Sequence, residues 1–483
     1  DSRHFSPEFA MEAAKTLAKH DIPAFVFESL RPTPELSFAV RYLHTFTGIM
    51  ITASHNPAAY NGYKVYGEDG GQMPPADADA LTAFVREIEN PLEIPVLSEE
   101  EAKHSGLITI IGEEVDTAYL KEVKTVTIDQ KLIETTGKNL KLVYTPLHGT
   151  GRMLGEKALK QAGFEQFIIE PSQAVADPNF STVKSPNPEE HSAFEYAIAL
   201  GEKEDADLLI ATDPDADRLG AAVRMPDGNY QVLTGNQLGA LMIRYILEAH
   251  KNAGTLPENA AVLKSIVSSE LPTAIAQSYD VEMVNVLTGF KFIAEKIQQY
   301  ETDHSHTFMF GFEESYGYLV KPFVRDKDAI QALVLLAEVA AFYKQSDKTL
   351  YDGLQDIFEE YGYYAEKTIS VTMSGMEGAA KITALMKTFR EKAPSVFAGI
   401  PVVQTEDFKE LTRVGLDGHM QKMTTPPSDV LKYTLEDESW IAVRPSGTEP
   451  KIKFYIGVKG NSSEDAANKI AELEAAINEI TEV

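Results

Sequence analysis

Short apolar runs alternate with amphipathic stretches through the first 345 residues of the chain. Runs of this length favour buried strands, and the amphipathic stretches between them favour helices that cover a sheet. The alternation therefore predicts repeated strand–helix–strand units and an α/β fold with mostly parallel sheets. One helix is predicted over about residues 7–19, where Ser6 and Pro7 mark its start.

Three of the apolar runs end in polar loops, at residues 52–57, 212–218 and 311–315. In open α/β sheets, ligands bind beyond the carboxyl ends of the strands, where such loops lie. The loops are about 160 and 100 residues apart. This spacing predicts three α/β domains in tandem, each offering one loop to a shared cleft.

The last 120 or so residues have a different pattern. Strands are predicted at 367–372, 440–443 and 451–458, and a closing helix from about Glu464. The short loop between the last two strands predicts an antiparallel sheet, and hence a fourth domain of the α+β type. The predicted domains are residues 1–113, 114–228, 229–365 and 366–483.

Charge and composition narrow the classes of function. The chain has 44 Lys and Arg against 73 Asp and Glu, a formal net charge of −29, which disfavours nucleic acid and anionic membrane surfaces as partners. An anionic substrate would need cations gathered in one cleft. The 483 residues include no cysteine, which excludes disulfides and thiolate metal sites and predicts a cytoplasmic protein. The apolar stretch from Ala329 to Phe342 is interrupted by Gln331 and Glu338, so no membrane span is predicted.

The loop after residues 208–211 carries Asp213, Asp215 and Asp217. Three carboxylates so close together need a cation to stay ionised, and hard oxygen ligands indicate Mg²⁺ or Ca²⁺. An EF-hand is excluded, because the sixth and twelfth positions hold Arg218 and Arg224 instead of Gly and Glu. An acidic surface turn is the alternative. Three protein oxygens leave Mg²⁺ short of six ligands, so water or a phosphate is expected to complete the shell.

Ser54 lies beside His55 in the first loop, which suggests a nucleophile. A serine hydrolase is poorly supported, because Ala53 and His55 stand where the Gly-x-Ser-x-Gly elbow requires glycines. Alone, Ser54 and Asn56 would be interpreted as turn and capping residues. Beside an acidic trio that lacks a ligand, a serine that carries phosphate would supply both an anionic oxygen and a transferable group.

Two further loops carry groups suited to a sugar phosphate. Residues 444–448 combine a guanidinium, two hydroxyls and a glycine, the parts of a phosphate cradle, and Lys451 and Lys453 follow. A hairpin turn with an incidental arginine is the alternative. Residues 311–315 offer two carboxylates and a hydroxyl, which suit the hydroxyls of a sugar.

Taken together, the four loops resemble the signature loops of the α-D-phosphohexomutase superfamily, in that family's order. The resemblance extends to residues 60–64, 288–291 and 325–328. The third loop is similar to the bacterial α-phosphoglucomutase and phosphopentomutase branch. The four loops are Thr52-Ala53-Ser54-His55-Asn56-Pro57, Asp213-Pro214-Asp215-Ala216-Asp217-Arg218, Gly311-Phe312-Glu313-Glu314-Ser315 and Arg444-Pro445-Ser446-Gly447-Thr448.

The resemblance implies three α/β domains with mixed sheets and a C-terminal domain in the style of a TATA-box-binding protein, arranged around a central cleft. Family members begin with a Gly-Ile-Arg-Gly-like segment that has no counterpart here. Asp1-Ser2-Arg3 with Ser6 resembles the next family element, Asp-x-Arg-x-x-Ser. We therefore expect about 80 residues or more of the intact enzyme to precede Asp1, and the family's first catalytic Arg is not assigned.

The activity that the resemblance implies is reversible transfer of phosphate between C1 and C6 of an aldohexose phosphate. Phosphorylated Ser54 would donate to glucose 1-phosphate, and glucose 1,6-bisphosphate would serve as intermediate and activator. Mg²⁺ would be held by Ser54, Asp213, Asp215 and Asp217. Pentose and mannose phosphates are alternative substrates within the family. A sugar-phosphate phosphatase and an inactive binding protein are alternatives outside it, and the sequence does not decide between monomer and homodimer.

The resemblance also implies residue roles. Ser54, His55, Lys64 and Arg218 are the predicted catalytic residues. Lys64 is favoured as the general base, with a pKa lowered by Arg218 and a metal, and His55 is the alternative; Lys64 could instead position phosphate. His148 is assigned to a structural loop. The predicted substrate contacts are Thr288, Gly289, Lys291, Glu313, Ser315, Arg325, Lys327, Arg444, Ser446, Gly447, Thr448 and Lys453.

Overall fold

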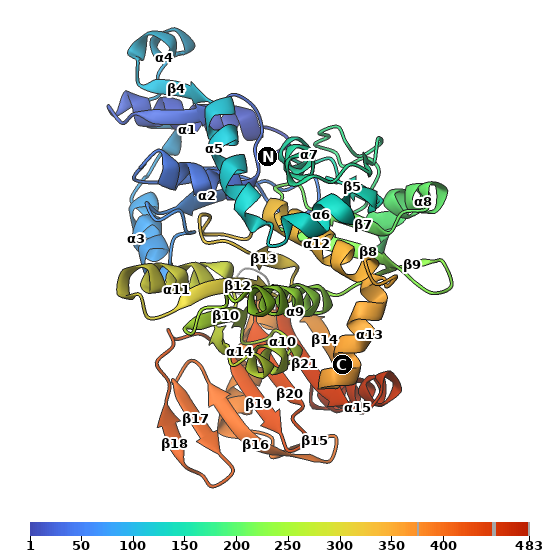
Figure 1. The fold of residues 1–483 in the computed structure, drawn as a ribbon. Coiled ribbons are helices and arrows are strands. Elements are labelled where there is room, and N and C mark those ends of the chain that lie inside the picture. Colours follow the sequence, from blue (N-terminus) through green and yellow to red (C-terminus); the bar gives the residue numbers. More distant parts are fainter. Residues whose placement is uncertain (374–375, 447–450, 482–483) are drawn as a thin grey trace. The chain divides into compact units, whose positions relative to one another are not determined.

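The computed structural model of the chain describes all residues except 374–375, 447–450 and 482–483. It divides into two compact units, each described here by itself (Figure 1). The larger unit comprises Asp1–Lys264, Ala276–Val284 and Gly289–Leu354, and the smaller one Ser265–Ile275, Asn285–Thr288 and Gln355–Val483.

The N-terminal part of the larger unit has two short strand pairs. Strand β1 (Ala24–Phe27) pairs in parallel with β4 (Ile108–Ile111), and β2 (Gly48–Ile51) pairs antiparallel with β3 (Tyr63–Tyr66). The helices here are α1 (Ser6–Lys19), α2 (Thr33–Tyr42), α3 (Pro75–Arg86), α4 (Glu99–Ser105) and α5 (Glu113–Val123).

The first predicted helix is present as α1, but it begins one residue early. Phe5, with a φ of 62°, precedes it, and Ser6 is its first residue. The Ser6 hydroxyl does not cap the helix, because it donates to the carbonyl of Ile51 at 3.3 Å and accepts from Asn61 Nδ2 at 3.0 Å.

A five-stranded sheet follows, in the order β6-β5-β7-β8-β9. Strand β5 runs parallel to β6 and β7, whereas β8 is antiparallel to both β7 and β9, so the sheet is mixed. This confirms the mixed sheets that the family resemblance implies, whereas the mostly parallel sheets expected from the alternation pattern are wrong here. The reason is the short connection between β7 and β8, residues 213–218, which allows only a hairpin. The elements are β5 (Leu142–Thr145), β6 (Phe167–Ile169), β7 (Leu208–Thr212), β8 (Leu219–Arg224), β9 (Tyr230–Val232), α6 (Gln130–Thr135), α7 (Gly151–Ala162) and α8 (Glu195–Glu204).

A four-stranded sheet has the order β11-β10-β12-β13, with β10 parallel to β12 and β12 antiparallel to β13. Its elements are β10 (Ala260–Ser265), β11 (Glu282–Val286), β12 (Thr307–Glu313), β13 (Gly317–Leu319), α9 (Gly235–Ala253), α10 (Leu271–Ser278), α11 (Phe290–Asp303), α12 (Ala329–Lys344) and α13 (Leu350–Tyr361). The α/β class predicted for the first three quarters of the chain is confirmed.

Helix α12 is buried along almost its whole length and packs against α6, α7 and α9. Its two buried polar side chains are satisfied: Gln331 bonds the backbone of Lys321, and Glu338 accepts from Tyr245 at 2.6 Å and from the backbone of residues 128–129. Along the described parts of the chain, no helix combines the length and the apolar character that crossing a membrane requires.

The smaller unit holds an antiparallel sheet in the order β14-β21-β20-β19-β16-β17-β18, with β15 paired to β16, which confirms the predicted antiparallel arrangement. One sheet face packs on helices α14 and α15 through a core that includes Val443, Phe454 and Leu473. The elements are β14 (Tyr363–Thr372), α14 (Met376–Glu391), β15 (Val396–Phe397), β16 (Ile400–Asp407), β17 (Thr412–Gly415), β18 (Met420–Lys422), β19 (Leu431–Leu435), β20 (Trp440–Pro445), β21 (Lys451–Gly460) and α15 (Ser463–Thr481).

Candidate active site

The loop between β2 and β3 presents Ser54 in a left-handed backbone conformation, with a φ of 53°. The Ser54 amide donates to Thr52 Oγ1 at 2.9 Å, and the Thr52 amide donates to the carbonyl of Gly62 at 3.1 Å. Gly62 is required at the base of the loop, because a Cβ there would lie 2.5 Å from the Thr52 carbonyl oxygen. The backbone therefore holds Ser54 in one orientation.

The acidic loop forms the hairpin turn between β7 and β8. Asp213, Asp215 and Asp217 are all buried, and one carboxylate oxygen of each lies within 4.8 Å of the others. Asp213 Oδ1 accepts hydrogen bonds from the amides of Asp217 at 3.1 Å and Arg218 at 3.0 Å. The loop's own backbone thus fixes the first carboxylate of the trio.

A neighbouring loop, residues 146–151, packs against the acidic loop at Pro214. Thr150 donates to the carbonyl of Pro214 through both its amide, at 2.7 Å, and its hydroxyl, at 2.9 Å. Gly149 packs so closely that a Cβ there would lie 2.4 Å from Pro214. His148 bonds Val175 and Thr182 in the same region, in keeping with the structural role expected for it.

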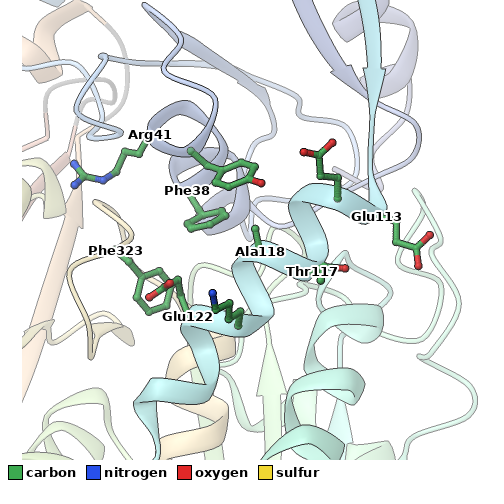
Figure 2. A pocket seen from close by; sticks show the side chains of 10 residues that line it. Phe38, Arg41, Glu113, Thr117, Ala118, Glu122 and Phe323 are labelled. Atoms are coloured by element: carbon green, nitrogen blue, oxygen red, sulfur yellow. The ribbon is translucent and has the colours of Figure 1, made fainter.

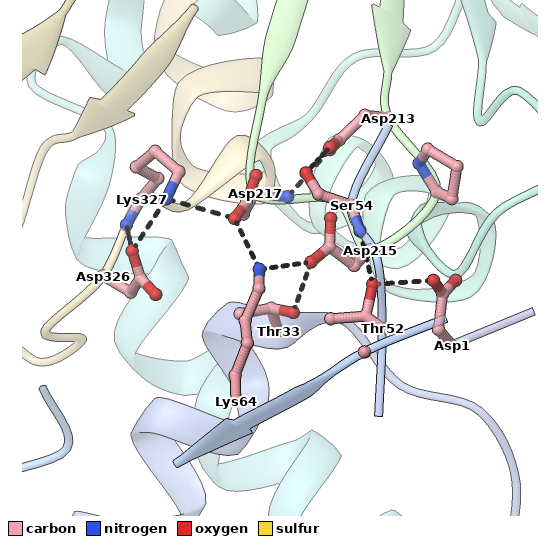
Figure 3. Close-up of polar contacts among 12 residues, drawn as sticks. Asp1, Thr33, Thr52, Ser54, Lys64, Asp213, Asp215, Asp217, Asp326 and Lys327 are labelled. Atoms are coloured by element: carbon pink, nitrogen blue, oxygen red, sulfur yellow. Dashed lines mark hydrogen bonds and ion pairs between the residues drawn. The ribbon is translucent and has the colours of Figure 1, made fainter. Parts of the chain in front are cut away.

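The serine and acidic loops meet at the hydroxyl of Ser54 (Figure 3). Ser54 Oγ donates to Asp213 Oδ2 at 2.9 Å and lies 3.3 Å from Nδ1 of His55. Thr33, at the start of α2, donates its hydroxyl to Asp215 Oδ2 at 2.8 Å. Three segments far apart in sequence therefore converge on one group of carboxylates.

Two lysines neutralise part of the acidic trio (Figure 3). Lys64 Nζ lies 3.1 Å from Asp215 Oδ2 and 3.6 Å from Asp217 Oδ2. Lys327 Nζ lies 3.1 Å from Asp217 Oδ2 and 3.0 Å from Asp326 Oδ1. Because these carboxylates are almost fully buried, the two ammonium groups compensate for negative charge that would be costly to bury unpaired.

The pKa values of Asp213 and Asp215 shift in opposite directions. Burial raises the pKa of Asp213 well above its usual value, and the charges of Asp215 and Asp217 add to the shift. Burial would also raise the pKa of Asp215, but the charge of Lys64 and the hydrogen bonds of that carboxyl together outweigh burial and hold its pKa below the usual value. Such divergence among adjacent acids is typical of functional sites.

The pKa of Lys64 departs from the sequence-based expectation. Burial lowers it, but Asp215 and Asp217 outweigh burial and raise the pKa above the ordinary value. The expected lowering assumed neighbours of positive charge only, whereas the lysine lies against two carboxylates. By contrast, burial and then Arg218 lower the pKa of His55 to about 3, so its imidazole is uncharged.

The third polar loop is tied to the acidic loop within the larger unit. Arg218 Nη1 donates to the carbonyl of Ser315 at 3.2 Å and to Glu189 at 2.9 Å. Glu313 is buried, and its Oε1 accepts from the amide of Gly289 at 2.7 Å. Burial raises the pKa of Glu313, and the charge of Glu314 adds to the shift.

Other predicted contacts lie elsewhere. Arg325 is buried, pairs with Glu301 through Nη2, and has no described contact with the acidic loop, unlike Lys327 two residues on. Lys291 Nζ lies 5.6 Å from the ring centre of Phe292. Among the described atoms, Thr288 Oγ1 is buried without a hydrogen-bond partner.

The predicted phosphate cradle belongs to the smaller unit. Arg444 and Lys453 are cross-strand partners on β20 and β21, so their side chains share one face of the sheet. The Ser446 amide donates to the carbonyl of Lys451 at 2.8 Å. Gly447 and Thr448 lie outside the described residues.

The residues that support the site were missed at the sequence level. They are Asp1, Arg3, Thr33, Thr52, Thr150 and Asp326. Asp1, Arg3, Thr52 and Asp326 belong to segments whose family resemblance was noted, but no role was assigned to them. Thr33 stands between two prolines in the sequence. That pattern indicates a fixed turn, but it does not predict that Thr33 contacts Asp215.

The acidic trio fits a divalent cation. Asp215 Oδ1 and Asp217 Oδ1 are buried and, among the described residues, have no hydrogen-bond partner. Asp217 Oδ1 lies 3.9 Å from Arg218 Nε, an ion pair without a hydrogen bond. Carboxylate oxygens of this kind beside a serine hydroxyl form an all-oxygen donor set that suits a hard cation such as Mg²⁺. Asp213, Asp215, Asp217 and Ser54 are the residues that would hold it.

A pocket of about 830 Å³ lies apart from these groups (Figure 2). Helices α2 and α5 form its walls with Phe323, and Phe38, Arg41 and Glu113 are among its lining residues. It shares no lining residue with the serine loop or the acidic loop. The concentration of reactive groups, not this pocket, therefore defines the candidate site.

Comparison with known proteins gives consistent matches. Models of the phosphoglucomutase/phosphomannomutase family match along the chain: α/β/α domain I at residues 1–92, domain II at 117–226, domain III at 234–361 and the C-terminal domain at 394–477. A phosphoglucomutase from Staphylococcus epidermidis is 43% identical over 472 residues, which cover 97% of this chain and 84% of that protein.

Solved structures share the fold. That of pp63/parafusin, a phosphoglucomutase from Paramecium, in its open form, gives a TM-score of 0.71 at 18% identity and covers 100% of this chain and 86% of that one. The N-acetylphosphoglucosamine mutase of Aspergillus fumigatus, in complex with GlcNAc-6P and magnesium, gives a TM-score of 0.53 at 14% identity and covers 99% and 94%.

Proposed function

Because the chain belongs to the phosphoglucomutase/phosphomannomutase family, we propose that it interconverts α-D-glucose 1-phosphate and glucose 6-phosphate through a phosphorylated Ser54. The observation that carries this proposal is the hydrogen bond from Ser54 Oγ to Asp213 within a buried trio of carboxylates. A serine in this position can carry a phosphoryl group next to a cation site, which is what phosphoryl transfer requires.

In the first half of the reaction, phosphorylated Ser54 donates its phosphoryl group to O6 of glucose 1-phosphate. The Oγ–P bond breaks, the P–O6 bond forms, the O6 proton passes to a base, and a proton returns to Oγ. The product is glucose 1,6-bisphosphate. After it turns around, Ser54 Oγ gives its proton to a base and takes the phosphoryl group from O1. The O1–P bond breaks, the Oγ–P bond forms, O1 gains a proton, and glucose 6-phosphate leaves.

Asp213, Asp215, Asp217 and the phosphoserine oxygen would hold Mg²⁺, which when bound supplies charge stabilisation for the transferring phosphoryl group. Support comes from the all-oxygen donor set and from two buried carboxylate oxygens that accept no hydrogen bond from the described residues. The protein's own contribution is to hold Ser54 Oγ against Asp213 in a fixed loop, so that little reorganisation is needed during transfer.

For proton transfer, we propose Lys64 as the main group and His55 as the alternative. Lys64 carries its proton in this structure and is suited to donate it as the Oγ–P bond breaks. His55 is uncharged, and its Nδ1 lies 3.3 Å from Ser54 Oγ, where it can accept the hydroxyl proton. Arg218 would stabilise charge on the phosphoryl group.

We propose that Glu313 and Ser315 bind sugar hydroxyls and that Lys327, Lys291, Thr288 and Gly289 contribute further contacts. Arg444, Ser446, Gly447, Thr448 and Lys453 would hold the phosphate that is not reacting. Arg325, which pairs with Glu301, stays a predicted substrate contact. The four domains proposed for these loops keep the boundaries 113, 228 and 365. A sugar phosphate is the proposed partner, and a cytoplasmic location stays a prediction from the sequence.

The proposal is tested by assaying the chain with the 1-phosphates of glucose, mannose, ribose and N-acetylglucosamine, with and without Mg²⁺ and glucose 1,6-bisphosphate. We expect the 6-phosphate of glucose to form fastest and only with Mg²⁺. Release of inorganic phosphate without isomerisation would identify a phosphatase instead, and binding without turnover would identify a binding protein.

A matched pair of variants makes the assay specific. Ser54→Ala is expected to lose mutase turnover. Ser305→Ala is the control, because Ser305 is exposed and lies 2.9 Å from the neighbouring imidazole of His306, yet stands outside the acidic cluster. The control is expected to keep full turnover.

A further inference from the structure

Arg3 is a buried side chain, only 2% exposed, that contacts the backbone of the loop at residues 54–60. Its Nη1 donates to the carbonyls of Pro57, at 3.0 Å, and Tyr60, at 2.9 Å. Its Nη2 donates to the carbonyls of Asn56, at 2.7 Å, and Ser54. Four carbonyl oxygens from one short loop therefore point at a single guanidinium.

The fifth donor of Arg3 is also used. Nε donates to Asp1 Oδ2 at 3.0 Å, so all five N–H groups of the guanidinium have acceptors. Lysine has three donors on a single nitrogen and cannot reproduce this planar arrangement. Without the guanidinium, the four carbonyls would lose their shared donor, and the loop would lose the hydrogen bonds that tie its backbone to Arg3.

A second route leads from the same segment to Ser54. Asp1 Oδ2 accepts from Thr52 Oγ1 at 2.7 Å, and Thr52 Oγ1 in turn accepts from the Ser54 amide at 2.9 Å (Figure 3). Arg3 and Asp1 together therefore bond the serine from both its carbonyl and, through Thr52, its amide.

The other side of the guanidinium is fixed as well. The Arg3 Cζ lies 5.1 Å from the ring centre of Phe180, which is itself 1% exposed. Phe180 belongs to the same turn as Asp177, whose amide donates to the carbonyl of His148 at 3.2 Å. The arginine is thus held between the serine loop and the segment that supports the acidic loop.

We propose that Arg3 is a positioning residue for phosphoryl transfer, one that sets the place of Ser54 Oγ relative to Asp213 by bonding the loop backbone. This inference rests on the proposed function. Arg3 contacts backbone carbonyls of the loop, Asp1 and Phe180, so we infer that it acts on Ser54 through the loop. A reacting oxygen displaced by about 1 Å can lower the rate of transfer about a hundredfold.

The test compares Arg3→Lys with Arg390→Lys. Arg390 is a partly buried arginine that pairs with Asp407 and Asp429 in the smaller unit, and its variant is the control for losing a guanidinium in general. We expect kcat of Arg3→Lys to fall about a hundredfold with KM nearly unchanged. The control is expected to keep its kcat.

Hydrogen exchange in the ligand-free protein gives a second readout that does not depend on turnover. The loop amides of Asn56 and Tyr60 donate to carbonyls within the loop, at 3.1 and 3.0 Å, and are expected to be protected in the wild type. In Arg3→Lys they should exchange at least tenfold faster, while the amides of Leu209 and Ile210 in β7 keep their protection.

Phe180→Leu is the milder variant if Arg3→Lys does not fold. It removes the aromatic face and leaves all five hydrogen bonds, so we expect a smaller loss of kcat and a smaller gain in loop exchange. Unchanged loop exchange in Arg3→Lys would overturn the inference. So would a rise in KM at constant kcat, which would make Arg3 a substrate ligand. If the wild-type protein shows no mutase turnover but loop exchange is still faster in Arg3→Lys, the positioning of the loop by Arg3 would be supported and the proposed function would be rejected.

Discussion

Ser54 Oγ and Asp213 Oδ2 lie 2.9 Å apart, although 159 positions separate the two residues in the chain. The contact joins the loop after β2 to the hairpin between β7 and β8 (Figure 3). It places a hydroxyl that can carry phosphate directly beside the carboxylates that can hold a cation. The predictions below follow from this arrangement.

Asp213→Asn is expected to weaken binding of divalent cations by about tenfold or more, because it removes one of three negative charges at a site of oxygen ligands. Thermal stability of the metal-free protein should be kept, because the pKa of Asp213 is raised well above its usual value and the neutral amide of Asn resembles the neutral form of that carboxyl. Calorimetric titration with Mg²⁺ measures the affinity. Asp227→Asn, in the exposed turn between β8 and β9, is the control and should leave the affinity unchanged; equal affinity in both variants would exclude Asp213 as a ligand.

Lys327→Met is expected to strengthen Mg²⁺ binding, to raise KM for the sugar phosphate and to lower thermal stability. The ammonium lies 3.1 Å from Asp217 and opposes a second cation there, so its removal should tighten binding about threefold or more. KM for the sugar phosphate should rise, and the metal-free protein should melt at a lower temperature because Asp217 and Asp326 lose a partner.

The control for this variant is Lys344→Met. Lys344 is the last residue of α12, and its ammonium lies 2.8 Å from Asp207. This control should leave Mg²⁺ affinity and KM unchanged. An unaltered Mg²⁺ affinity in Lys327→Met would mean that the lysine does not compete with the cation.

Lys64 and His55 are the two candidate residues for proton transfer, and variants of each can distinguish them. Lys64→Arg keeps the positive charge against Asp215 but cannot release a proton, so we expect kcat to fall about a hundredfold or more. His55→Gln should retain most of the turnover. Steady-state kinetics of both variants decides the matter, and the reverse pattern would assign proton transfer to His55.

The meeting of the serine and acidic loops followed from the sequence, because both come directly after buried apolar strands. The family resemblance implied the mixed sheet, and the chain itself supports it, since the six positions between Thr212 and Leu219 are too few for a parallel crossover. The alternation of apolar runs and amphipathic stretches predicted where the strands lie but not the direction in which each one runs. The length of each connection indicates whether two neighbouring strands are parallel or antiparallel.

Other features depend on contacts that no local pattern contains. Arg325 and Lys327 are two positions apart, yet one pairs with Glu301 and the other with Asp217. The direction of the Lys64 pKa shift is a sum over neighbours from another loop, which the sequence places near but not next to it. The bonds from Arg3 to loop carbonyls leave no mark on the sequence, because any residue supplies a carbonyl.

Glu35 predicts a pH dependence of stability. Its carboxyl is fully buried in α2, and burial raises its pKa to about 9, with a contribution from Asp116. Between about pH 4.5 and 9 the folded chain holds a proton that the unfolded chain has released, so the free energy of unfolding falls as pH rises through this range. Glu35→Gln should flatten this slope by up to about 1.4 kcal/mol per pH unit.

Chemical denaturation at several pH values measures the effect, and Glu114→Gln, at an exposed position of α5, is the control. The control should follow the wild type at every pH. A slope in Glu35→Gln that matches the wild type would show that Glu35 is ionised in the folded protein.

The most direct test of the phosphoserine mechanism is tandem mass spectrometry of the chain after incubation with glucose 1,6-bisphosphate and Mg²⁺. We predict one phosphoryl group per chain, located on Ser54. If that group is isotopically labelled, unlabelled glucose 1-phosphate should move the label into glucose 1,6-bisphosphate and glucose 6-phosphate, while Ser54 is phosphorylated again at the end of each cycle. Turnover of glucose 1-phosphate with no phosphate on Ser54 at any stage, or undiminished turnover by Ser54→Ala, would contradict it.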